Sequence, residues 1–302
     1  MEHTPRRFDR VQDIAIRALL GLVLAVPYRY RIPLMGRLCS SVIAPIAGWR
    51  RRIRSNLAHA CPDLPPAEVR RLQRAVPDNV GRTLIEIYSG AEFKAHVAGT
   101  PLSGPGLEPL RDAREAGRPV VLVTAHLGNF DALRAALFHQ GVPLAALYRE
   151  MNNPHFNVHY VAALSAIGTP LFPNKRRGVT QFVRHIADGG AVGILTDVYS
   201  RKGADVTFFG QSAPTSVAAC DWALKYNALV IPCYGIRKPD GLSFDIRLEA
   251  PVEHSDPVTM TQAINDNLEL QVRQHMEQWF WVHRRWKPER RRKGATRDRR
   301  SA

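Results

Sequence analysis

A histidine and an aspartate stand five residues apart at the end of an apolar run. The run "VVLVTA" leads into His126, and Asp131 follows after Gly128 and Asn129. Asn129 can cap a helix that opens after Gly128, which places Asp131 in the first turn of that helix. From there its carboxylate can turn back and hydrogen-bond the imidazole, which fixes the tautomer and makes the other ring nitrogen more basic. No serine or cysteine adjoins His126, so the pair is predicted to act as a general base on a substrate hydroxyl.

Two further polar residues follow predicted strands. Arg149 comes after "PLAALY", and Asp197 comes after "AVGILT". The carboxyl ends of parallel strands meet at one edge of a sheet, where such folds bind their ligands. We therefore predict that His126, Arg149 and Asp197 converge there. Taken singly, each has a plainer interpretation: a strand-end histidine beside an acid favoured by the helix dipole, a surface salt bridge, and a turn-forming acid.

The elements that position these residues alternate between strand and helix. From residue 120 onward, short apolar runs alternate with helical patterns, while residues 50–98 have helical periodicity throughout. This order predicts an α/β fold with a mostly parallel central sheet and helices on both faces. "LSFDIRLEAP" is predicted as a last strand on the sheet edge, and residues 259–282 as a long terminal helix.

The chain divides into three predicted parts. They are an apolar N-terminal segment over residues 1–49 that associates with a membrane, a catalytic domain over 50–288, and a basic, disordered tail over 289–302. Residues 14–28 are apolar except for Arg17, but a spanning helix needs about 20 such residues. We expect a membrane-associating segment, either one marginal span or an interfacial helix pair. A helical hairpin packed on the domain is the alternative. The arginines that follow it keep the remainder on the cytoplasmic side by the positive-inside rule.

Charge and composition restrict the partners. The formal net charge is +15, which indicates an anionic partner such as nucleic acid, anionic lipid or an acidic protein. Lys175, Arg176 and Arg177 follow a short predicted strand, a position suited to phosphate, although a solvated loop would look the same. The four cysteines form no C-x-x-C pair and are expected to be reduced thiols. His155 and His159 have the spacing of a zinc pair but lack the accompanying glutamate, so no metal is expected.

Several blocks together resemble a known family. "HLGNFD" contains an H-x4-D pattern, and it is similar to the corresponding block of the bacterial lipid A biosynthesis acyltransferases. "RRRIRSNLAHACPDLPPAEV", "YREMNNP", "GGAVGILTDV", "VTFFGQSAPT", "ALVIPCYGIR" and "EQWFWVHRRWK" resemble further blocks of that family in the same order. The resemblance covers about residues 10–288, and its closing aromatic block is the most specific.

The resemblance implies transfer of a fatty acyl chain from acyl carrier protein, as co-substrate, to a lipid hydroxyl at the cytoplasmic face of the inner membrane. It implies His126 as the base with Asp131 as its partner. Arg149 would hold a phosphate or the developing oxyanion, and Asp197 would organise the site by pairing with Arg149. Phe208, Phe209 and Gly210 would shape the acyl or acceptor pocket, with a plain core role as the alternative. No cofactor and no nucleic acid is expected.

The chain also departs from the family pattern. The family more often has glutamate at Asp131 and glutamine at Val198, and it usually has proline at Met276. The change at Val198 leaves the acceptor open between a lipid A precursor, a lysophospholipid, an amino-acid lipid and a phosphatidylinositol mannoside. A different class also stays open at this point, a non-catalytic basic protein that binds membrane or RNA.

Overall fold

A seven-stranded sheet forms the centre of the protein, with the strand order β1-β9-β8-β2-β5-β3-β4. The computed structural model describes residues 7–287. All neighbouring strands are parallel except β8 and β9, which are antiparallel. The mostly parallel sheet predicted from the sequence is therefore confirmed. The strands are β1 (Leu102–Ser103), β2 (Val120–Thr124), β3 (Leu144–Tyr148), β4 (Leu171–Pro173), β5 (Ala191–Leu195), β8 (Leu229–Arg237) and β9 (Phe244–Leu248).

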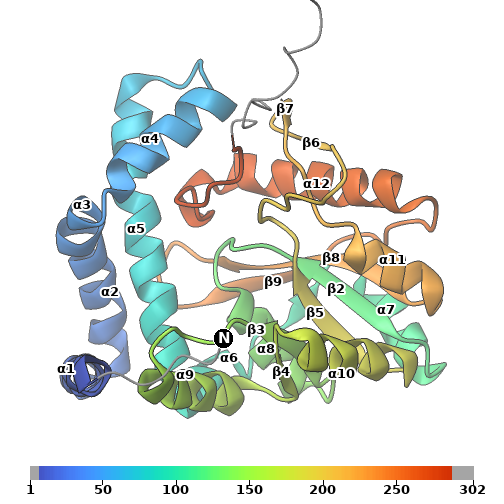
Figure 1. Cartoon of the computed structure of the whole chain (residues 1–302), viewed down its shortest axis with the longest axis horizontal. Helices are drawn as coiled ribbons and strands as arrows, with labels where there is room; N and C mark the ends of the chain where they lie inside the picture. Colours follow the sequence, from blue (N-terminus) through green and yellow to red (C-terminus); the bar gives the residue numbers. More distant parts are fainter. Residues whose placement is uncertain (1–6, 288–302) are drawn as a thin grey trace, which may run out of the picture.

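Helices cover both faces of the sheet, as the continuous apolar character of β2 predicts. Val120 and Leu122 pack into the core on one face, and Val121 and Val123 into the core on the other. The first face carries α6 (Gly90–Val97), α7 (Leu107–Glu115), α8 (Phe130–His139) and α9 (Pro154–Ile167). The second carries α10 (Arg176–Ala187), α11 (Ala218–Lys225) and α12 (Pro257–Gln274). Figure 1 shows α10, α11 and α12 beside the strands that they cover.

Two predictions about the sheet and its last helix are wrong. β9 is not an edge strand, because the short strand β1 pairs with it and forms the edge. The terminal helix does not reach residue 282: α12 ends at Gln274, and a 3-10 turn over Met276–Gln278 and an irregular segment follow. That segment leaves the helix because Trp279 pairs with Leu127 beside the end of β2. A small hairpin of β6 (Thr207–Phe208) and β7 (Gln211–Ser212) was not predicted.

The N-terminal third is helical, as predicted for residues 50–98. Its elements are α1 (Arg7–Leu24), α2 (Tyr28–Leu38), the π-helix η1 (Cys39–Ile43), α3 (Ala44–Ile46), α4 (Trp49–Ala60) and α5 (Pro66–Tyr88). Figure 1 shows α2 and α5 side by side at one side of the sheet. The two helices approach closely at Gly81, where an added Cβ would lie 2.5 Å from the carbonyl oxygen of Met35. Ile32, Met35 and Ile85 are buried between them.

The membrane association predicted for residues 10–49 stays a prediction. Within residues 7–287, no single helix has the length and apolar character of a membrane span, and one bent pair, Tyr28–Ile46 with Trp49–Ala60, passes that test at an angle of 86°. Several large apolar side chains of this region are nevertheless exposed. They are Val11, Ile14, Leu19, Leu22, Val42 and Ile46.

Candidate active site

The turn between β2 and α8 brings His126 to the carboxyl edge of the sheet. Gly128 takes a left-handed conformation with φ of 60°, and an added Cβ there would lie 2.1 Å from the carbonyl oxygen of Gly235. Asn129 then caps α8, because its Oδ1 accepts hydrogen bonds from the backbone N–H of Asp131 at 2.9 Å and of Ala132 at 3.2 Å. The strand, glycine turn and capped helix are those that the sequence predicts.

Asp197, and not Asp131, is the carboxylate that contacts the His126 ring. His126 Nδ1 lies 2.8 Å from Asp197 Oδ1, and the backbone N–H of His126 donates to Asp197 Oδ2 at 3.0 Å. Trp279 Nε1 donates to the same Oδ2 at 3.0 Å. Burial raises the pKa of Asp197, but the charge and hydrogen bonds of His126 more than offset this, and the pKa lies well below its ordinary value. The carboxylate stays ionised and holds the imidazole by Nδ1, which leaves Nε2 for a substrate.

Asp131 has a different neighbour. Its Oδ1 lies 2.8 Å from Arg134 Nη2, an ion pair between side chains that are both buried. Arg134 also donates to the backbone carbonyls of Leu164 and Gly168, which ties α8 to α9. Asp131 and Arg134 are three residues apart and therefore share a helix face. Because a buried arginine needs a counter-charge, Asp131 pairs with Arg134 and not with His126. The predicted ring contact is thus corrected, while a part for Asp131 in catalysis stays a prediction.

A cavity of about 660 Å³ opens beside the imidazole. Its wall includes His126, Asp131 and Arg149, so the structure brings these three predicted residues to one cavity. Arg149 is exposed at the end of β3. It does not form the ion pair with Asp197 that we expected, because the Asp197 oxygens are occupied by His126 and Trp279. The rest of the wall is mainly apolar and includes Phe130, Leu133, Tyr148, Tyr160, Leu164 and Trp222.

The remaining predicted residues do not line this cavity. Lys175, Arg176 and Arg177 are exposed at the start of α10, next to Asn174, which is part of the wall. Phe208 and Phe209 are buried in an aromatic cluster instead. The alternative of a core role therefore describes these phenylalanines better than a pocket role.

That cluster packs against the contact between Asp197 and Trp279. Phe208 packs against Trp279 with ring centroids 5.4 Å apart, and Trp279 is the residue that donates to Asp197. Phe209 and Gly210 both have positive φ, 55° and 66°, and they form the tight turn of the β6–β7 hairpin. The hairpin thus keeps an indole in place rather than shaping a substrate pocket.

The closing aromatic segment contributes a residue that was not predicted to be part of the active site. The His283 ring lies 4.5 Å from the His126 ring, centroid to centroid, and it lines the same cavity. Burial lowers the pKa of His283 to about 4, so this imidazole is neutral near pH 7. The donor atoms of His126, Asp197 and His283 lie within 4.8 Å of one another. Since Asp197 is already bonded to His126 and Trp279, we interpret the group as an acid–base arrangement. In the sequence, the unusual density of aromatic residues in "WFWVHRRW" is the feature that could have pointed to His283.

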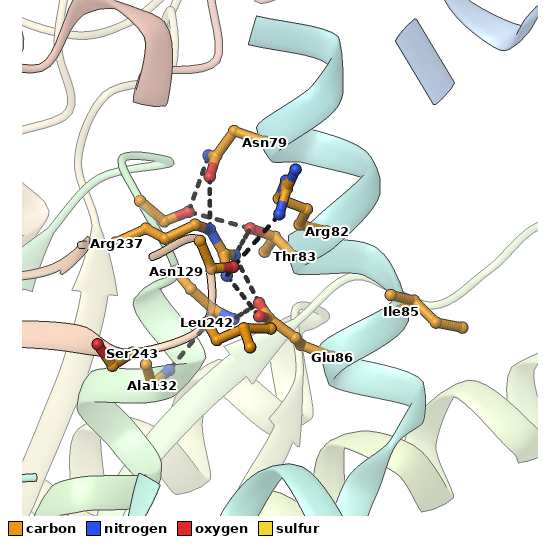
Figure 2. A network of polar contacts seen from close by, with 12 residues as sticks. Asn79, Arg82, Thr83, Ile85, Glu86, Asn129, Ala132, Arg237, Leu242 and Ser243 are labelled. Carbon is orange, nitrogen blue, oxygen red and sulfur yellow. Dashed lines mark hydrogen bonds and ion pairs between the residues drawn. The ribbon is translucent and has the colours of Figure 1, made fainter. Parts of the chain in front are cut away.

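A buried polar network holds the same turn from the side of α5 (Figure 2). Glu86 is fully buried and pairs with Arg237 of β8 through hydrogen bonds of 2.5 and 2.6 Å. Asn129 Nδ2 donates to Glu86 at 2.7 Å. The Gly128 carbonyl accepts from Thr83 Oγ1 at 3.1 Å and from Asn79 Nδ2 at 3.3 Å. Side chains of two elements, α5 and β8, thereby fix Gly128 and Asn129, two of the residues that connect His126 to α8.

A histidine held by a buried acid thus lies at the carboxyl edge of a mostly parallel sheet, beside a mainly apolar cavity. This is where α/β enzymes bind their ligands. The sequence matches the model of the bacterial lipid A biosynthesis acyltransferase family over residues 6–288, and the chain belongs to that family.

Characterised relatives cover nearly the whole chain. It is 24% identical to a lipid A biosynthesis acyltransferase of Haemophilus influenzae, over 87% of this chain and 83% of the relative. It is 23% identical to a phosphatidylinositol mannoside acyltransferase of Mycolicibacterium smegmatis, over 92% of each. It is 24% identical to a lipid A biosynthesis lauroyltransferase of Escherichia coli, over 89% of each. The protein is accordingly an acyltransferase.

Proposed function

We propose that this acyltransferase moves a fatty acyl chain from acyl carrier protein to a hydroxyl group of a lipid A precursor, with His126 as the general base. The observation that carries the proposal is the His126–Asp197 hydrogen bond of 2.8 Å at the wall of an apolar cavity. An imidazole held at Nδ1 by a carboxylate is the form that accepts a proton at Nε2.

In the proposed reaction, Nε2 of His126 removes the proton from the acceptor hydroxyl as its oxygen attacks the thioester carbonyl. The tetrahedral intermediate collapses by breaking the carbon–sulfur bond, and the thiolate takes the proton back from the imidazolium. Asp197 stabilises that imidazolium through its negative charge. Arg149, the exposed cation on the cavity wall, stabilises the oxyanion or holds a phosphate of the acceptor.

The cavity is suited to the acyl chain. Its volume of about 660 Å³ falls within the range of small-molecule sites, and its wall is mainly apolar. Acyl carrier protein is acidic, and a protein with a net charge of +15 attracts it and anionic lipid alike. The exposed apolar side chains of α1, such as Ile14 and Leu22, favour contact with the cytoplasmic face of the membrane.

A second acceptor class, phosphatidylinositol mannosides, is favoured by one comparison. The mycobacterial relative matches 92% of this chain, as extensive a match as those with the lipid A enzymes. Val198, which stands where the family usually has glutamine, lies on the cavity wall and is 43% exposed. An apolar side chain at this position changes the part of the cavity wall that we expect to contact the acceptor. Both acceptors are therefore tested as substrates.

The proposal predicts that His126→Ala strongly reduces acyl transfer. We expect kcat to fall by about two to four orders of magnitude, because the variant loses general-base catalysis. Transfer would be measured in detergent from acyl carrier protein thioesters of several chain lengths to a lipid A precursor and, in parallel, to a phosphatidylinositol mannoside.

His139→Ala is the matched control, since His139 is exposed at the end of the same helix, α8. This variant should retain wild-type activity. Equal product from His126→Ala and wild type would remove His126 from the mechanism. Product on the mannoside alone would replace the lipid A precursor as the acceptor.

A further inference from the structure

A second, larger cavity lies away from His126. It is a groove of about 1160 Å³ between α2, α5 and the turn that joins β8 to β9, and it shares no wall residue with the cavity at His126. Its wall carries eight arginine and lysine residues against three acidic ones. The basic residues are Arg29, Arg37, Arg70, Arg71, Arg74, Arg82, Arg237 and Lys238, and the acids are Asp78, Asp240 and Glu277. The wall residues therefore have an excess of five positive charges, or of four when the pairing of Arg237 with Glu86 is counted.

Four of these arginines form no salt bridge within residues 7–287, and Arg29 of α2, which lies over the Tyr30 ring, is one of them. Arg37 of α2 and Arg70 and Arg74 of α5 are exposed, and none of them forms a salt bridge there. Arg70 and Arg74 are one turn apart on the same helix face, where like charges repel. Arg37 adds a third positive charge from the neighbouring helix, so the packing of α2 on α5 increases this repulsion. An anion in the groove would relieve it.

Exposed apolar side chains lie on the same helices as the groove. On α2, Arg29 and Arg37 line the groove, while Tyr30 is 55% exposed and Leu34 is 46% exposed. The following helices expose Val42 and Ile46, the latter at 83%. A cationic groove bordered by apolar side chains matches a ligand that has an anionic head and apolar tails.

We propose that this groove binds the phosphate-bearing headgroup of a lipid, with the acyl tails against the exposed apolar side chains of α2, η1 and α3. A concave groove suits a headgroup better than the face of a folded acidic protein, which needs a broad and complementary surface. The site is separate from the acyl cavity, so the proposal holds whether or not His126 is the base.

The groove also reaches the active-site turn. Asn79 and Arg237 are part of its wall, and Asn79 donates to the Gly128 carbonyl. Arg237 Nε donates to Asn79 Oδ1 at 3.0 Å. A headgroup at this end of the groove would contact the side chains that hold the residues next to His126 (Figure 2).

The test replaces three of the four arginines that form no salt bridge in the described part of the chain by glutamine: Arg37→Gln, Arg70→Gln and Arg74→Gln in one full-length variant. Cosedimentation is measured with vesicles of phosphatidylcholine alone and of phosphatidylcholine with phosphatidic acid. We expect wild type to prefer the phosphatidic acid vesicles and the triple variant to lose that preference by about tenfold or more. The control carries Arg111→Gln, Arg184→Gln and Arg201→Gln, which make the same charge change outside the groove. It should keep the preference.

Three outcomes would overturn the proposal. The first is equal vesicle binding by the triple variant and the control. The second is tight binding of soluble glycerol phosphate by wild type that the triple variant loses, which would make the groove a site for a free phosphate. The third is unchanged vesicle binding together with a raised KM for the acyl carrier protein thioester, which would make it a protein interface. Binding is measured without turnover, so failure of the acyl-transfer proposal does not affect the result.

Discussion

Asp197 joins three parts of the chain at one carboxylate. It accepts from the ring and the backbone of His126 and from the indole of Trp279. The acid therefore sets the tautomer of the base and also the position of its backbone. A side chain with both tasks should tolerate little change.

Asp197→Asn is expected to lower kcat by about two to four orders of magnitude with a smaller effect on KM. An amide can donate to Nδ1 and thereby favour the wrong tautomer, and it cannot balance the charge of the imidazolium. Steady-state kinetics and thermal unfolding of the same preparations would separate lost chemistry from lost folding.

Asp131→Asn is the comparison, because Asp131 pairs with Arg134 and not with His126. We expect this variant to have a clearly lower free energy of unfolding, while its kcat changes much less than that of Asp197→Asn. The opposite order, with kcat lower for Asp131→Asn than for Asp197→Asn, would restore Asp131 as the partner of the base.

At the residue level, the sequence predicted which site residues follow strands. It did not predict toward which partners their side chains point. His126, Arg149 and Asp197 do follow strands at one sheet edge, and His126 and Arg149 share a cavity. The choice between Asp131 and Asp197 depended on whether Arg134 would be buried, which no pattern states. Trp279 and His283 were not assigned to the site, because a helix predicted to run to residue 282 gave no sign that this segment returns to the end of β2.

At the level of elements, α5 does more than support the N-terminal helices. It supplies Asn79, Thr83 and Glu86 to the network around the active-site turn, and Arg237 of β8 completes it. A helix far from His126 in the sequence thereby fixes the path from β2 to α8.

Glu86→Gln should reduce both stability and kcat. The change leaves Arg237 buried without its full counter-charge, which costs about 3–5 kcal/mol when a buried pair is broken. It also loosens Asn129, and misplacement of a base by about 1 Å can lower the rate about a hundredfold. Activity would be compared at a temperature far below both unfolding midpoints.

Leu110→Ala provides the control for destabilisation alone. Leu110 is buried on α7, and its truncation costs a similar free energy of unfolding, about 2–5 kcal/mol. If both variants kept wild-type kcat at low temperature, the network would be structural only. A lower kcat in Glu86→Gln alone would identify Glu86 as a positioning residue.

Longer elements were predictable because their apolar patterns are long enough to be distinctive. The runs that form β2, β5 and β8 were recognised, as were the helices of residues 50–98. Strands of two residues, such as β1 and β6, have no detectable alternation. The end of α12 was placed too late because buried tryptophans read equally well as helix or as irregular core.

For the whole molecule, acid should reduce stability in two steps. The pKa of His283 falls from an ordinary 6.5 to about 4 in the folded protein. Below about pH 6.5 the unfolded chain therefore binds a proton that the folded protein does not, and stability falls down to about pH 4 by at most about 3 kcal/mol. The pKa of Asp197 is also lowered by folding, so its contribution is lost as the pH falls below the ordinary value of an aspartate.

Urea unfolding at a series of pH values would measure this dependence. His283→Gln should flatten the slope between about pH 6.5 and pH 4 and leave the steeper loss at lower pH. A slope unchanged by the substitution would assign the acid sensitivity to another group.

The pairing of Leu127 with Trp279 has a consequence for the order in which the enzyme becomes complete. The ribosome makes His126 and Asp197 well before Trp279, whose indole donates to Asp197. A nascent or prematurely terminated chain that lacks Trp279 contains the base and its acid without the contact that fixes them. We therefore expect polypeptides that are truncated before Trp279 to lack acyltransferase activity.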